Sequence, residues 1–232
     1  MEKMRVRVKL LESALGTSPS NENIYRDFIA SKAPDLESVE EEAKAIGGID
    51  ADDKGVTVFP RMDDGTPMFW DYQIRGFFKE ACGMLSRAGG KDENGKKKAV
   101  NKSSAMKAYK KNIDGLIFVL PRQIPIVTDR EIGFCQRSLR AETMQGPRTT
   151  LAMSEEVSAG STIEFTVICP SADFMQAVRE WLDYGYLHGL GQWRNSGKGT
   201  FTWEELDDAG NVIPGSGNGS LSEEDALMRV AI

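Results

Sequence analysis

The stretch GLGQWRNSGKGTF, residues 189–201, constrains the fold more than any other part of the sequence. Four glycines, Gly189, Gly191, Gly197 and Gly199, fall within eleven residues. Glycine permits positive φ angles and lets a second backbone come close, so a folded chain concentrates it where such geometry is needed. Two interpretations stay open: a tight connection between a helix and a strand, or a cradle of backbone N–H groups for phosphate.

The flanking segments place this stretch between a helix and a strand. Apolar residues recur at helical spacing over Ala172–Leu187, and Thr200–Leu206 is typical of a strand. The stretch is not a P-loop, because no Gly-Lys-Ser/Thr closes it and a strand follows it. Arg194 and Lys198 would add positive charge for a phosphate. Trp193 either stacks on a base or packs against protein.

The rest of the pattern predicts an α+β fold, with helices packed on a mainly antiparallel sheet. The alternation in MRVRVKLL, Met4–Leu11, indicates a half-buried strand, and Phe69–Ser86 has the strongest helical periodicity. Gly76 and Gly83 lie inside this helix, which suggests close packing against another backbone. Further helices are expected at Ser20–Ser31, Asp35–Ile46 and Ser222–Val230, and further strands at Gly55–Phe59, Gly115–Leu120, Gln123–Val127, Ser138–Thr143, Thr149–Met153 and Thr162–Cys169.

Charge is distributed unevenly along the chain. Arg87–Asn112 holds nine Lys or Arg and two acids, a net +7, which leaves −13 for the remainder of a chain whose total is −6. We interpret this segment as a basic, flexible insertion whose second half is helical. Its lysines Lys96, Lys97 and Lys98 either form a solvated loop or grip a polyanion. The acidic remainder argues against general nucleic-acid binding.

Length and composition predict a single domain over residues 1–206, with 207–232 as a C-terminal tail. The chain has 232 residues, of which 40% are hydrophobic, and no apolar run long enough to span a membrane. Three distant cysteines give neither a metal-binding spacing nor a disulfide framework, so we expect a cytoplasmic protein without metal or other cofactor.

Three segments resemble one known family. GLGQWRNSGKG is similar to the glycine-rich loop of the RAMP superfamily of CRISPR-associated proteins, which lies between the second helix and the last strand of a ferredoxin-like (RRM-like) unit. DYQIRGFFKEACGML resembles a helix of the backbone subunits in CRISPR effector complexes, with Arg75-Gly76 in the place of Lys-Gly. RTTLAMSEEVSAGSTIEFTVI resembles their strand-turn-strand. The overall pattern is also similar to proteins encoded by phages.

The resemblance implies a ferredoxin-like core with extra N-terminal helices and a basic insertion, and a protein that binds RNA or a nucleotide without catalysis. It also implies head-to-tail self-association or contact with other subunits of a complex. The positions expected to bind nucleic acid carry glycines, cations and one aromatic ring: Gly189, Gly191, Trp193, Arg194, Gly197, Lys198, Gly199, Arg75, Lys79, Lys96, Lys97 and Lys98. Arg137, Arg140 and Arg148 either line an RNA path or pair with surface acids.

Two alternatives remain open. One is an endoribonuclease, with or without metal, because some RAMP nucleases use a histidine as general acid or base and His188 is the only histidine. However, His188 follows Phe174 by fourteen residues and so falls near the apolar face of a helix. The other is a phage-type interaction protein that mimics a subunit of a defence complex or sequesters a nucleotide, which the acidic composition favours.

Overall fold

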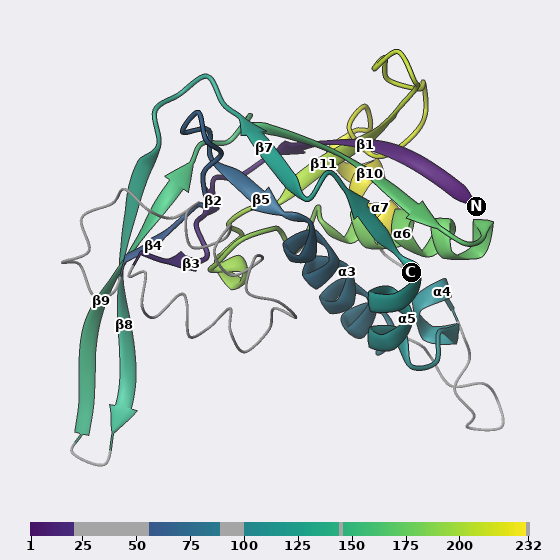
Figure 1. The fold of residues 1–232 in the computed structure, drawn as a ribbon. Helices are drawn as coiled ribbons and strands as arrows, with labels where there is room; N and C mark the ends of the chain where they lie inside the picture. Colours follow the sequence, from purple (N-terminus) through teal and green to yellow (C-terminus); the bar gives the residue numbers. More distant parts are fainter. Residues whose placement is uncertain (21–55, 89–99, 144–145, 231–232) are drawn as a thin grey trace, which may run out of the picture.

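The computed structural model describes residues 1–20, 56–88, 100–143 and 146–230 (Figure 1). The region predicted to form the two extra N-terminal helices, after Ser20, lies outside the described residues, as do Lys96, Lys97 and Lys98.

A central antiparallel sheet organises the chain. Its strand order is β11-β1-β10-β7-β5, and β6 also pairs with β10. Burial alternates along β1, with Met4, Val6, Val8 and Leu10 on the inner face, because successive side chains of a strand point to opposite faces. The strands span Glu2–Leu10 (β1), Met68–Trp70 (β5), Phe118–Leu120 (β6), Gln123–Val127 (β7), Thr162–Cys169 (β10) and Phe201–Leu206 (β11).

Helices α3 (Asp71–Leu85) and α6 (Ala172–Tyr184) pack against each other on the inner face of this sheet (Figure 1). The Phe78 ring of α3 and the Trp181 ring of α6 meet at a centroid distance of 5.5 Å, and both residues are fully buried. Apolar residues spaced three and four apart give each helix one buried stripe. The expectation of an α+β fold with helices on antiparallel strands is confirmed.

A second sheet carries a long hairpin. Strands β8 and β9 pair in an unbroken antiparallel register from Gly133↔Glu156 to Thr143↔Gly146, and the hairpin extends away from the body (Figure 1). Both strands are longer than predicted: β8 also includes residues 133–137, and β9 also includes residues 146–148 and 154–157. The strands of this sheet are β2 (Ala14–Leu15), β3 (Ser18–Pro19), β4 (Val56–Val58), β8 (Gly133–Thr143) and β9 (Gly146–Val157).

Two helix boundaries differ from the sequence prediction by more than one residue. Helix α3 begins at Asp71 rather than Phe69, because β5 occupies Met68–Trp70 and Gln73 Oε1 caps the helix by accepting from Trp70 N at 2.7 Å. Helix α6 ends at Tyr184 rather than Leu187. Its C-cap, Gly185, packs so closely that an added Cβ would lie 2.0 Å from the Phe201 ring.

Short helices and the C-terminal segment complete the described body. The second half of the basic segment forms α4 (Lys102–Ala105) and α5 (Tyr109–Leu116), as predicted. Residues after β11 fold back on it: Asn218 Oδ1 accepts from Trp203 N at 2.8 Å, and α7 (Glu223–Val230) packs on α6. The domain boundary at residue 206 stays a prediction. None of the described helices combines the length and apolarity needed to cross a membrane.

Candidate functional site

The glycine-rich loop, Gly189–Gly199, folds back on itself through its backbone. Leu190 N donates to Gly199 O at 2.9 Å, so the two ends of the loop touch. An added Cβ on Gly189 would lie 1.9 Å from the carbonyl carbon of Gly199, and one on Gly199, at φ +73°, would lie 1.9 Å from Leu190 O. Gly191, at φ +87°, would bring its Cβ to 2.6 Å from Leu15 O. These close approaches account for three of the four glycines without any ligand.

Gly197 is the fourth glycine of the loop and has a different role. Its φ of +84° requires glycine, yet nothing lies within 4 Å of an added Cβ. Gly197 closes the short 3-10 helix η1 (Arg194–Ser196) by donating from its N–H to Arg194 O at 2.9 Å. The loop therefore combines packing contacts at its ends with an exposed turn at its tip.

Trp193 and Arg137 form a cation–aromatic pair at this tip. Trp193 adopts φ +56°, a conformation that costs a non-glycine residue roughly 1–2 kcal/mol, and its side chain is 44% exposed. The Arg137 guanidinium, at the base of β8, lies 5.4 Å from the centre of the indole ring, and its Nη2 donates to Gln192 Oε1 at 2.7 Å. Its Nε and Nη1 atoms are buried and have no hydrogen-bond acceptor among the described residues.

The four described cations predicted to bind phosphate each pair with a carboxylate. Arg75 and Lys79 share a stripe of α3, and neither forms a hydrogen bond or ion pair with the described residues of the glycine-rich loop. Arg194 and Lys198 belong to the loop and face different elements. The pairs are Arg75–Asp71 at 2.9 Å, Lys79–Asp114, Arg194–Glu80 and Lys198–Glu156 at 2.7 Å. A phosphate at any of these positions has to compete with the carboxylate already present.

Glu80 joins α3 to the glycine-rich loop. One carboxylate oxygen lies 2.9 Å from His188 Nε2, and the other accepts from Arg194 Nη1. The expectation that His188 lies near the apolar face is corrected, because α6 has already ended and the side chain is half-buried against this carboxylate. Burial, and then the Glu80 charge, raise the pKa of the adjacent Tyr184 above its usual value.

Lys198 fastens the loop to the second sheet. Its Nζ donates to Ser13 Oγ at 2.6 Å and to Glu156 Oε1 at 2.7 Å. Burial raises the pKa of Glu156, but the hydrogen bonds from Lys198 and Ser13 outweigh it, so the pKa lies below its ordinary value. A lowered carboxyl pKa stabilises the fold above the unfolded-state pKa, and this contribution is lost as the pH falls through the folded-state value.

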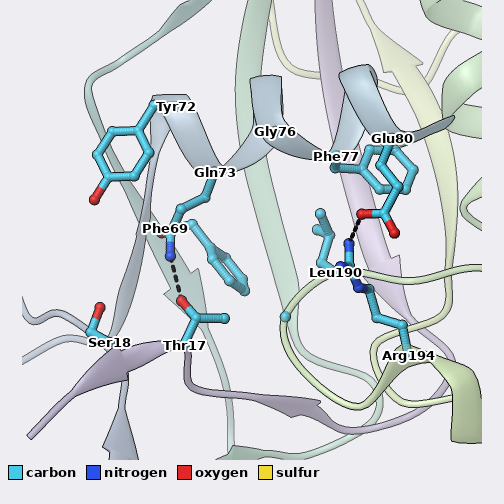
Figure 2. A pocket seen from close by; sticks show the side chains of 11 residues that line it. Thr17, Ser18, Phe69, Tyr72, Gln73, Gly76, Phe77, Glu80, Leu190 and Arg194 are labelled. Carbon is cyan, nitrogen blue, oxygen red and sulfur yellow. Dashed lines mark hydrogen bonds and ion pairs between the residues drawn. The ribbon is translucent and has the colours of Figure 1, made fainter. Parts of the chain in front are cut away.

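A pocket of about 340 Å³ separates α3 from the glycine-rich loop (Figure 2). Its α3 side is formed by Gln73, Gly76, Phe77 and Glu80, which share one helical face at steps of three and four. Gly76 has nothing within 4 Å of an added Cβ, so it opens into the pocket instead of packing against a backbone as the sequence suggested. Gly83 packs closely, but against a side chain and not a backbone: an added Cβ would lie 2.8 Å from the Tyr109 hydroxyl.

Replacing Gly76 by alanine is expected to raise the free energy of unfolding by up to about 1 kcal/mol, because alanine restricts the unfolded chain and meets no atom in the pocket. Urea denaturation measures the change. Gly115→Ala in α5, which also meets nothing within 4 Å, is the matched control outside the pocket. A loss of stability in Gly76→Ala alone would mean that the pocket is closed in solution.

The described part of the chain contains no group of three or more His, Cys, Asp or Glu side chains that could hold a metal ion. The three cysteines are free thiols. Burial raises the pKa of Cys82 to about 11. The side chains of Arg140 and Arg148 fall among the residues that are not described.

Comparisons with known proteins give distant structural similarity only. No protein-family model and no curated protein matches the chain. The chain is similar to one in the cryo-EM structure of the Type III-B Cmr-beta bound to cognate target RNA, with 11% identity over 89% of this chain and 60% of that chain and a TM-score of 0.45. It is also similar to a chain of a Type IV-B CRISPR complex, with 13% identity over 92% of this chain and 94% of that chain and a TM-score of 0.44. Similarity at this level assigns a role to no residue.

The sequence anticipated part of this site. It placed Trp193, Arg194 and Lys198 in one loop and named Arg137 as lining an RNA path or pairing with acids. It missed the pocket side chains Thr17, Ser18, Gln73 and Glu80. The spacing of Gln73, Gly76, Phe77 and Glu80 would have shown that Gly76 shares a face with two polar residues.

Proposed function

We propose that the protein binds RNA without cleaving it and that its core is a ferredoxin-like RAMP unit. The strand order β11-β1-β10-β6 supports the second part, because α3 lies between β1 and β6 along the chain and α6 lies between β10 and β11. The glycine-rich loop lies between α6 and β11, the position that the resemblance implies. Self-association and a place in a larger complex remain predictions.

The observation that carries the RNA proposal is the pairing of Arg137 with Trp193. Exposed aromatic rings stack on bases of any sequence, and an arginine beside the ring adds charge for the phosphate backbone. Arg137 forms no ion pair with a carboxylate among the described residues, whereas the four cations predicted from the sequence each form one. A hollow of about 380 Å³ adjoins the pair, lined by Glu80, His188, Gly191, Gln192, Trp193, Arg194 and Asn195.

Arg137→Ala is expected to weaken the binding of a labelled single-stranded RNA about tenfold and to reduce the salt dependence by about one phosphate contact. Fluorescence polarisation at several salt concentrations measures both. Arg179→Ala, which removes an arginine paired with Glu205 on another element, is the control with the same change in net charge. If both variants lost RNA affinity equally, the loss would come from the change in net charge alone, which would contradict the proposed site.

A second candidate function is favoured by the carboxylate pairing itself. Because Asp71, Asp114, Glu80 and Glu156 neutralise the predicted phosphate-binding cations, the surface suits protein contact as well as nucleic acid. Light scattering and the 260/280 absorbance ratio of the purified protein, before and after a high-salt wash, separate the two. A protein free of nucleic acid, with no affinity for added RNA, would favour the interaction protein.

A further inference from the structure

We infer that the pocket between α3 and the glycine-rich loop binds a single nucleobase, with uracil as the best fit. This inference rests on the proposed RNA binding and extends it, because the pocket and the hollow beside Trp193 share Glu80, Gly191 and Arg194. A strand lying across the hollow can therefore place one base in the pocket.

The pocket has the size of a site for a small ligand. Its volume of about 340 Å³ falls at the lower end of small-molecule sites, which span roughly 300–1,000 Å³. Phe69, Phe77 and Leu190 supply apolar walls, and Gly76 leaves one side without a side chain (Figure 2). A ring can thus approach the α3 backbone closely at Gly76, where any larger residue would fill the space.

Hydrogen bonding at one end of the pocket selects a ligand with acceptors. Trp70 N donates to Gln73 Oε1, so the Gln73 amide nitrogen faces Thr17 and donates to Thr17 Oγ1 at 2.6 Å. Thr17 already accepts this bond, so its own hydroxyl hydrogen is a donor, and no described residue accepts it. The second hydrogen of the Gln73 amide is a further donor. The Ser18 hydroxyl lies at the same end (Figure 2).

The two ends of the pocket differ in charge. Thr17, Ser18 and Gln73 are neutral, whereas Glu80 and Arg194 form an ion pair at the other end. A neutral base with carbonyl oxygens satisfies the donors at the first end, and its ribose and phosphate would lie toward Arg194. Uracil carries two exocyclic carbonyl oxygens, whereas adenine carries none, so the donor pattern favours uracil over adenine.

The test is a titration of the full chain with uridine, cytidine, adenosine and guanosine monophosphates, followed by backbone amide chemical shifts. Uridine monophosphate is expected to shift Thr17, Gly76 and Leu190 most strongly, and Thr17→Val and Gly76→Leu are expected to weaken this binding about tenfold. Gly115→Leu is the control for a leucine on an exposed helical glycine. Absence of shifts at these three amides, or equal shifts with adenosine monophosphate, would overturn the inference.

Short oligonucleotides separate this inference from the proposed function. A uridine hexamer and an abasic hexamer with the same backbone are titrated against the wild type and Gly76→Leu. If the pocket takes a base, Gly76→Leu lowers the affinity for the uridine hexamer alone. Equal affinity of the wild type for both hexamers refutes the base pocket and leaves RNA binding intact. If neither hexamer binds, the proposed function fails, and the mononucleotide titration alone decides for or against the pocket.

Discussion

Gly199→Ala is expected to lower the free energy of unfolding by about 3 kcal/mol or more, one of the largest effects that an added methyl group would have at any described glycine. Two causes add: the residue would adopt φ +73°, and its Cβ would lie 1.9 Å from Leu190 O. The obstacle is backbone held by the bond from Leu190 N to Gly199 O, so it cannot move aside as the end of a side chain can. Urea denaturation measures the loss.

Two other glycines of the same loop separate these causes. Gly197→Ala keeps the positive φ but meets nothing within 4 Å, so it is expected to cost about 1–2 kcal/mol. Gly189→Ala lacks a positive φ but meets the Gly199 carbonyl carbon at 1.9 Å, so it is expected to cost about 3 kcal/mol. If Gly197→Ala lowered the free energy of unfolding more than the other two variants did, the close approach of the loop ends would not be the reason that glycines are needed.

The periodicity of apolar residues predicted most of the helices and strands of the central sheet. Met4–Leu11, Gln123–Val127 and Thr162–Cys169 were predicted as strands from alternation or short apolar runs, and β1, β7 and β10 occupy these segments. These strands could be predicted because one face of each is buried, so apolar residues recur at every second position. The hairpin β8–β9 was predicted too short for the complementary reason: ladder hydrogen bonds, unlike burial, leave no pattern of apolar residues.

The candidate site was less predictable because it is assembled from distant segments. Arg137 of β8 contacts Trp193 and donates to Gln192, both in the glycine-rich loop far along the chain. Thr17, between β2 and β3, accepts a hydrogen bond from Gln73 of α3. No local spacing encodes such contacts. The sequence also could not predict the ion pairs of Arg194 and Lys198. Their carboxylate partners, Glu80 and Glu156 respectively, lie more than 40 residues away along the chain.

Arg61→Ala is expected to lower the free energy of unfolding by about 2–3 kcal/mol, because it leaves Glu155 charged and buried without its cation. The Glu155 side chain is only 3% exposed, and it accepts from Arg61 Nη2 and, at 2.8 Å, from Phe59 N. Arg61 is partly exposed, so water can replace it in part, which keeps the expected loss below that of a fully buried pair. Urea denaturation of Arg61→Ala measures this loss of stability.

The double variant Arg61→Ala/Glu155→Gln identifies the cause. Glutamine removes the charge but keeps an acceptor for Phe59 N, so Glu155→Gln is expected to cost only about 1 kcal/mol. With glutamine present, loss of Arg61 should cost little, and the double variant should be more stable than Arg61→Ala. Additive losses would show that Arg61 acts through packing alone.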